Sequence, residues 1–189
     1  MNASSVWVFG YGSLIWAPGF AYESRQIARL EGYQRSFCMR SIHHRGTMER
    51  PGLVLALDRA QGGCEGVAFE IPQRIAEESL EYLRARELIS AAYMETRVKL
   101  QLRDGRQVEA VTYVIDRAHD QYCAGLSLED QAQIIARAVG GRGPNDAYLF
   151  NTAEHLTKLG LRDPDLDWLA ARVRALLSAG LDATPPFKG

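Results

Sequence analysis

The sequence is poor in the residues that build disulfide frameworks and metal centres, with three cysteines and four histidines among 189 residues. Cys38, Cys64 and Cys123 are odd in number and widely spaced, which is not a disulfide pattern. No histidine pair has the spacing of a helical zinc site, so no metal is expected. A nucleophile built from Cys38 with His43 or His44 has no supporting pattern, and a small buried hydrophobe is the ordinary role of such a cysteine.

An excess of charge of one sign is also missing. The 22 basic and 23 acidic residues give a net charge of −1, whereas nucleic acid or an anionic membrane surface calls for a basic face. No apolar run approaches the length of a membrane span. The first five residues have neither the basic start nor the apolar core of a signal peptide. We therefore expect a cytoplasmic protein with no nucleic-acid or membrane partner.

What is present is ordinary globular composition, with 47% hydrophobic and 24% charged residues. A chain of this length is long enough to bury a real core and is typical of one domain. We predict a single domain over residues 1–189, with a loose tail at 180–189.

The first two-thirds of the chain has the patterns of strands. They are predicted at 6–9, 35–42, 53–57, 65–71, 94–102 and 107–115. The last two form a hairpin through Asp104-Gly105, because Asp-Gly between alternating runs is a strong turn signal. Val98, Leu100 and Leu102 then share one face.

Helices are predicted at 74–87 and through the last third of the chain. Ser127 resembles an N-cap that opens a helix to about residue 139, followed by a loop at 140–145. A further helix is expected at 146–159, and Asp163-Pro164 opens a final one to about 179. Strands first and helices later predict an α+β fold, with the sheet curved or closed into a barrel.

The first strand ends in Gly10-Tyr11-Gly12-Ser13-Leu14. Glycine lets the backbone turn and leaves amide N–H groups uncovered, and successive exposed amides form a concave anion site. The hydroxyls of Tyr11 and Ser13 add polar groups. The loop could hold a carboxylate, or it could be a plain glycine turn at the end of a strand.

A carboxylate stands where an apolar residue is expected in the helix at 74–87. Ala76, Leu80 and Leu83 form one apolar stripe, and the next position on it is Glu87. A buried carboxylate is costly without a partner, and burial favours its protonated form, as a general acid–base requires. The alternative is that the helix ends here and Glu87 turns to solvent or pairs with Arg86 or Arg97.

Several stretches together resemble the γ-glutamylcyclotransferase superfamily, and more narrowly its ChaC-type, glutathione-specific members. The resemblance covers roughly residues 6–165 and includes the glycine loop and the Arg-Glu pair at 86–87. The matching stretches are at 9–16, 30–35, 44–47, 51–57, 66–69, 82–87 and 147–149.

The resemblance implies a mixed β-barrel-like sheet with flanking helices and an enzyme without cofactor. The α-amine of the substrate attacks its own γ-carbonyl, which releases 5-oxoproline and, from glutathione, cysteinylglycine. Glu87 matches the catalytic glutamate, which would take a proton from the attacking amine and return it to the leaving amine. Gly10, Tyr11, Gly12, Ser13 and Leu14 match the loop that holds the γ-glutamyl head group.

Two further residues are candidates for binding the small-molecule substrate. Arg45 could bind the glycine-end carboxylate of glutathione through a bidentate pair of hydrogen bonds, or it could be a surface arginine. Tyr148 could bond the head group, or it could be a core tyrosine. Two rival functions remain: the same cyclisation of other γ-glutamyl amino acids or γ-glutamylamines, and a binding module without turnover.

Overall fold

The structure, a computed structural model, describes residues 5–180, which fold into two compact units. The barrel unit comprises residues 5–36 and 55–122, and the helical unit comprises 37–54 and 123–180. Of the tail predicted to be loose at 180–189, all but residue 180 lies outside the described residues. The assignment of a single domain stays a prediction.

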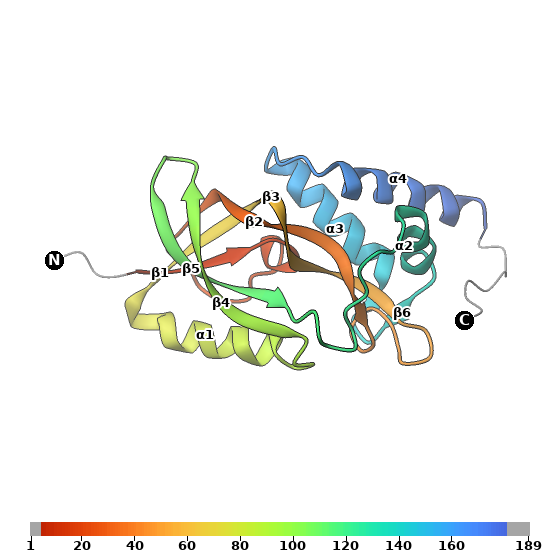
Figure 1. The fold of residues 1–189 in the computed structure, drawn as a ribbon, viewed down its shortest axis with the longest axis horizontal. Helices are drawn as coiled ribbons and strands as arrows, with labels where there is room; N and C mark the ends of the chain where they lie inside the picture. The colour runs from red at the N-terminus through yellow and green to blue at the C-terminus, as the bar shows by residue number, and fades with distance from the viewer. Residues whose placement is uncertain (1–4, 181–189) are drawn as a thin grey trace. The chain divides into compact units, whose positions relative to one another are not determined.

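The barrel unit is built on five strands that close on themselves in the order β1-β3-β2-β4-β5 (Figure 1). They are β1 (Ser5–Gly10), β2 (Ser24–Ser41), β3 (Gly52–Pro72), β4 (Tyr93–Leu102) and β5 (Gln107–Ile115). Most neighbours are antiparallel, but β1 pairs with β5 in parallel at Trp7↔Ala110, and so does β3 with β5. The mixed barrel with helices confirms the predicted α+β class.

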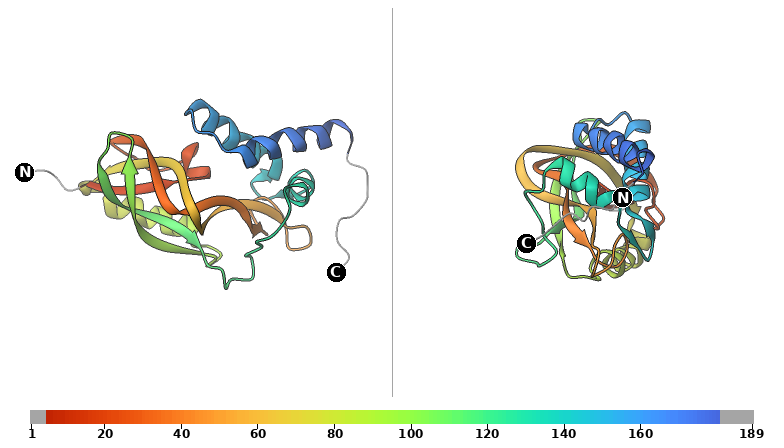
Figure 2. Two further views of the ribbon diagram at one scale, coloured as in Figure 1. Left: turned by 45° about the horizontal axis from the view of Figure 1, so that its top comes forward. Right: turned by 90° about the vertical axis from the view of Figure 1, so that its right-hand side faces the viewer.

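The strand predictions are confirmed at the start of the chain and at the hairpin, whose register runs from Tyr93↔Ile115 to Gln101↔Gln107. They are wrong in the middle. β2 begins at Ser24 instead of 35, and one long β3 replaces the two strands predicted at 53–57 and 65–71. Gly62 has φ +97 within β3, so the glycines there mark an irregularity inside a strand rather than its end. Both long strands are curved (Figure 2).

Apolar side chains from all five strands fill the barrel. Trp7 and Phe9 of β1 pack with Leu57 of β3 and Leu100 of β4. Val98, Leu100 and Leu102 are all buried, as their alternation predicts.

Helix α1 (Gln73–Glu87) lies against β1 (Figure 1). It also packs against the segment that follows β1. Its stripe of Ala76, Leu80 and Leu83 is buried as predicted and packs with Val8 and Leu14. Since Leu14 belongs to the 3-10 turn η1 (Ser13–Ile15), apolar packing draws the glycine loop onto the helix.

The helical unit contains α2 (Leu128–Ile135), α3 (Asn145–Lys158) and α4 (Pro164–Ser178). The N-cap predictions are confirmed, because Ser127 accepts from the amide of Asp130 and Asp163 from that of Leu166. Helix α2 ends four residues before the predicted 139. The reason is that β6 (Val139–Gly140) pairs with β7 (Gly143–Pro144) in the region predicted to be a loop.

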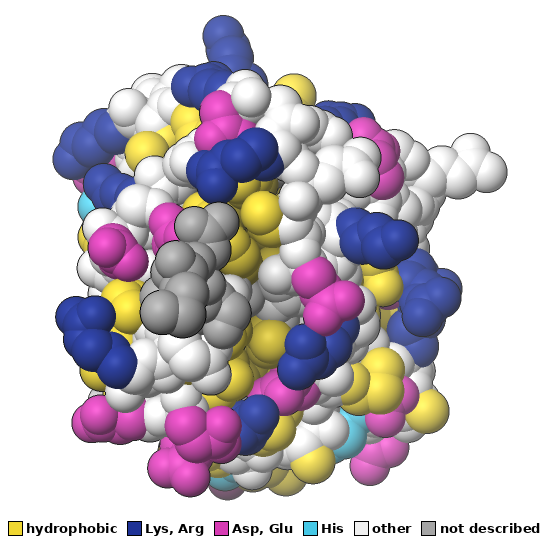
Figure 3. Space-filling view, turned by 90° about the vertical axis from the view of Figure 1, so that its left-hand side faces the viewer, with side chains coloured by type: hydrophobic (Ala, Val, Ile, Leu, Met, Phe, Trp, Pro, Cys, Tyr) yellow, Lys and Arg dark blue, Asp and Glu magenta, His cyan; other side chains and the backbone are white. Residues whose placement is uncertain are grey.

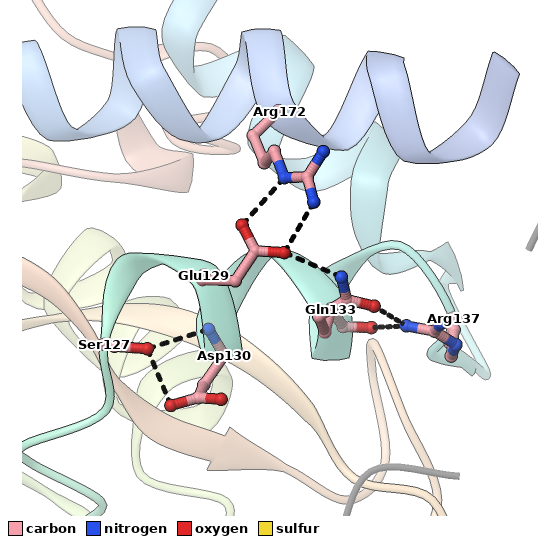
Figure 4. Close-up of polar contacts among 6 residues, drawn as sticks. All are labelled: Ser127, Glu129, Asp130, Gln133, Arg137 and Arg172. Atoms are coloured by element: carbon pink, nitrogen blue, oxygen red, sulfur yellow. Dashed lines mark hydrogen bonds and ion pairs between the residues drawn. The ribbon is translucent and has the colours of Figure 1, made fainter. Parts of the chain in front are cut away.

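Two polar contacts hold this unit together. Glu129 of α2 accepts two hydrogen bonds of 2.7 Å from Arg172 of α4 (Figure 4). The amide of Leu53 donates to Asn145 Oδ1, and Asn145 Nδ2 donates back to the Leu53 carbonyl, both at 2.7 Å. Asn145 is fully buried, so this exchange satisfies polar groups that water cannot reach.

Basic and acidic side chains lie interspersed on the face drawn in Figure 3, with hydrophobic side chains between them. Within residues 5–180, no helix is long and apolar enough to cross a membrane. The same described residues contain no cluster of metal-ligating side chains.

Candidate functional site

The glycine loop follows β1 and leads into η1. The first hydrogen bond of this turn runs from the Ile15 amide to the Gly12 carbonyl at 3.0 Å. The amides of Gly12, Ser13 and Leu14 therefore precede the first bonded N–H of the turn, where donors are available to a ligand. The start of the loop packs closely against β3: a Cβ on Gly66 of that strand would lie 2.4 Å from the Gly10 carbonyl oxygen.

Glu87 is the last residue of α1 and is turned away from solvent. Its side chain is 17% exposed, against 78% for Glu77 on the opposite face. The prediction that this carboxylate is sheltered from solvent while its acidic neighbours on the helix are exposed is confirmed. The pairing foreseen as an alternative also occurs, because Arg86 Nε lies 3.1 Å from Glu87 Oε1. Arg97 instead pairs with Glu109 at 2.8 Å.

Arg86 joins this carboxylate to the glycine loop. Its Nη2 donates to Ser13 Oγ at 3.0 Å, and its Nη1 donates to the carbonyls of Ala17 and Pro18. The structure thus brings the predicted loop and the predicted catalytic carboxylate together within the barrel unit. Sequence reasoning considered Arg86 only as a partner of Glu87. The Arg-Glu pair at the end of the helix was the available sequence signal for Arg86. Its backbone acceptors lie about 70 residues earlier, and backbone carbonyls leave no pattern in the sequence.

Two buried tyrosines, Tyr11 of the loop and Tyr113 of β5, lie next to each other. Tyr11 is buried, and its hydroxyl donates to the Tyr113 carbonyl at 2.8 Å. The Tyr113 hydroxyl donates to Glu95 at 3.3 Å. Burial first, and then the negative charges of Glu95 and Glu87, raise the pKa of Tyr113 far above its usual value. Tyr113, which sequence reasoning missed, therefore stays protonated within the electrostatic reach of Glu87.

Arg45 and Tyr148 lie together in the helical unit. The Arg45 guanidinium stands 5.7 Å from the centre of the Tyr148 ring, and its Nη1 donates to the carbonyls of Arg142 and Pro144. Burial is the main cause that lowers the pKa of Arg45. Tyr148 is 7% exposed and packs edge-on against Phe37. Both side chains have structural contacts, and their roles toward substrate stay predictions.

The three cysteines are buried and free of disulfides. Cys38 is thus buried, as a cysteine that acts as a small hydrophobe usually is.

Residues 6–176 match the family described as ChaC-like protein. A glutathione-specific gamma-glutamylcyclotransferase of Escherichia coli is 39% identical over 173 residues, which are 92% of this chain and 74% of that protein. Gamma-glutamylcyclotransferase 2-3 of Arabidopsis thaliana is 34% identical over 191 residues, covering 95% and 96% of the two chains.

Among solved structures, the fold resembles a yeast gamma-glutamyl cyclotransferase specific to glutathione. The TM-score is 0.83 at 25% sequence identity, covering 91% of this chain and 96% of the yeast chain. The matched residues include both the loop after β1 and the end of α1. This chain belongs to the ChaC-like protein family.

Proposed function

We propose that this protein is a γ-glutamylcyclotransferase that converts glutathione to 5-oxoproline and cysteinylglycine. The observation that carries the proposal is the sheltered Glu87 carboxylate, which Arg86 ties to a loop with uncommitted amides. The names of the E. coli and yeast relatives support glutathione as substrate.

The reaction forms a bond between the α-nitrogen and the γ-carbonyl carbon and breaks the γ-amide bond. An α-ammonium is not nucleophilic, so Glu87 first accepts a proton from it. Glu87 then returns a proton to the leaving amine, which departs as the free amino group of cysteinylglycine. Because ring closure is intramolecular, orientation can supply up to about 7–11 kcal/mol of the barrier reduction.

The glycine loop would hold the γ-glutamyl head group by its α-carboxylate. The amides of Gly12, Ser13 and Leu14 are donors of the kind that anions bind. Ser13 Oγ accepts from Arg86 Nη2, so its own hydrogen points elsewhere and can be donated to the carboxylate. We assign Gly10 and Tyr11 to the support of this loop, because the Tyr11 hydroxyl donates to the Tyr113 carbonyl.

The remaining assignments rest on the family resemblance. Arg45 is proposed to bind the glycine-end carboxylate of glutathione, and Tyr148 to bond the head group. No hydrogen bond to a described residue uses Nε or Nη2 of Arg45, so two donor groups remain for a ligand. We also propose a cytoplasmic location, which the three buried cysteines without disulfide bonds support.

A second candidate is the same cyclisation of other γ-glutamyl compounds. The observation that favours it is the Arabidopsis relative, whose name specifies the reaction without glutathione. A binding module without turnover is a weaker candidate, because an anion receptor gains nothing from a carboxylate beside its loop.

The test is to incubate the purified protein with glutathione, γ-glutamylcysteine and a panel of other γ-glutamyl amino acids and amines, and to quantify 5-oxoproline. Glutathione should give the highest kcat/KM. Higher values on another compound would support the second candidate, and ligand binding without any 5-oxoproline would support the binding module.

A further inference from the structure

The Arg86 side chain makes more polar contacts across the candidate site than a simple ion pair requires. Nε faces Glu87 at 3.1 Å, Nη2 faces Ser13 Oγ at 3.0 Å, and Nη1 reaches the Pro18 carbonyl at 3.2 Å and that of Ala17. All three guanidinium nitrogens are therefore in use. One planar group spans the carboxylate and both ends of the loop segment 13–18.

The surroundings make this bridge rigid. The Arg86 side chain is 13% exposed, whereas Arg84 on the same helix is 39% exposed and donates to the carboxylates of Glu77 and Glu95. One turn before Arg86, on the same helix face, Tyr82 reaches Gly19, the residue after this segment. Gly19 has φ +76, which favours glycine, and a Cβ there would lie 2.1 Å from the Tyr82 hydroxyl.

The charge of Arg86 also resolves a conflict within the site. The Glu87 carboxylate lies near a loop suited to anions, and two like charges in a sheltered site repel strongly. The guanidinium offsets the charge of Glu87 and leaves the loop amides available to a second carboxylate. A neutral hydrogen-bond donor in its place would hold the loop but leave the repulsion.

We propose that Arg86 is a positioning residue that sets the orientation of the Glu87 carboxylate against the head-group loop. This inference rests on the proposed cyclotransferase function, in which Glu87 must meet both the attacking and the leaving nitrogen. Arg86 touches the base and the loop, and its effect reaches the substrate through them.

The test compares Arg86→Ala and Arg86→Lys with the wild type and with Arg84→Ala, a control that removes another ion-paired arginine from α1. Each folded variant is assayed with glutathione for kcat, KM and the pH profile of kcat/KM. A displacement of about 1 Å can cost about 100-fold in rate, so kcat of Arg86→Ala should fall about 100-fold. Lysine keeps the charge without the planar fork, so Arg86→Lys should fall by an intermediate factor.

The pH profile separates positioning from a merely structural role. Without the guanidinium, the carboxylate binds its proton more tightly, so the acid limb of Arg86→Ala should move to higher pH. In Arg86→Lys it should stay near that of the wild type. Hydrogen exchange of amides 13–17 should also quicken in Arg86→Ala and stay unchanged in Arg84→Ala.

Three results would overturn the proposal. One is a folded Arg86→Ala that keeps the wild-type kcat and acid limb. Another is a loss confined to KM. If Arg86→Ala does not fold, a folded Arg86→Lys with the wild-type kcat also contradicts a role for the fork. Wild-type protein that releases no 5-oxoproline from any compound would instead overturn the proposed function, and this role with it.

Discussion

Replacing Glu87 by glutamine removes the proton acceptor and leaves most of the local structure in place. The glutamine carbonyl can still accept from Arg86 Nε, which lies 3.1 Å from the carboxylate oxygen. A hydrogen bond to a charged group is worth about 1.5–3 kcal/mol, and only part of it is lost when the acceptor becomes neutral. We therefore expect the free energy of unfolding to fall by less than about 2 kcal/mol.

The kinetic loss should be larger. A general acid–base contributes about 100-fold to 10,000-fold, which corresponds to about 3–5.5 kcal/mol in the barrier. The loss should appear in kcat. KM should stay level or fall, because the unpaired Arg86 charge attracts the head-group carboxylate.

The assay is 5-oxoproline release from glutathione by folded Glu87→Gln, wild type and Glu81→Gln, whose side chain is exposed on the same helix. Unfolding in urea reports the stability of each protein. If Glu87→Gln retains more than about a tenth of the wild-type kcat, Glu87 is not the acid–base.

Three further predictions concern the rest of the molecule. Arg45→Ala should lower kcat/KM for glutathione by about 10-fold to 150-fold, but much less for γ-glutamylcysteine, and equal losses on both substrates would contradict the role in binding the glycine end. Leu83→Ala, at a fully buried position, should lower the free energy of unfolding by about 2–5 kcal/mol in urea titrations; a cost under about 1 kcal/mol would refute its place in the core. Arg172 lowers the pKa of Glu129 to about 2, whereas the pKa of this carboxyl in the unfolded chain is about 4.3. The pair therefore stabilises the fold fully at pH values above about 4.3, and this contribution is lost as the pH falls toward 2. The stability gap between wild type and Glu129→Gln should therefore shrink between about pH 4.5 and 2, and a constant gap would argue against the shift.

The sequence predicted the parts of the site that depend on local periodicity. The stripe of Ala76, Leu80 and Leu83 places Glu87 by helical geometry alone, and the structure confirms that its side chain is sheltered. The end of β1 was likewise readable from an apolar run followed by glycine.

Other features depend on contacts distant in sequence. The acceptors of Arg86 include the backbone carbonyls of Ala17 and Pro18, which every residue type possesses. β2 could not be traced back to Ser24 because the polar residues around Gly32 are exposed and break the apolar pattern. The early end of α2 depends on pairing between β6 and β7, which its own residues do not encode.

The reciprocal hydrogen bonds between Leu53 and Asn145 affect how the chain folds while it is being synthesised. The two residues are 92 positions apart, so at about 5–20 residues per second Leu53 waits roughly 5–18 s for its partner to be made. The barrel strands can pair as soon as β5 has emerged, whereas residues 37–54 lack the helices of their unit until synthesis is nearly complete. During that interval Phe37, Cys38 and Met39, all buried in the finished protein, are open to chaperones and proteases. A nascent chain stalled after β5 should therefore be cleaved first near this segment.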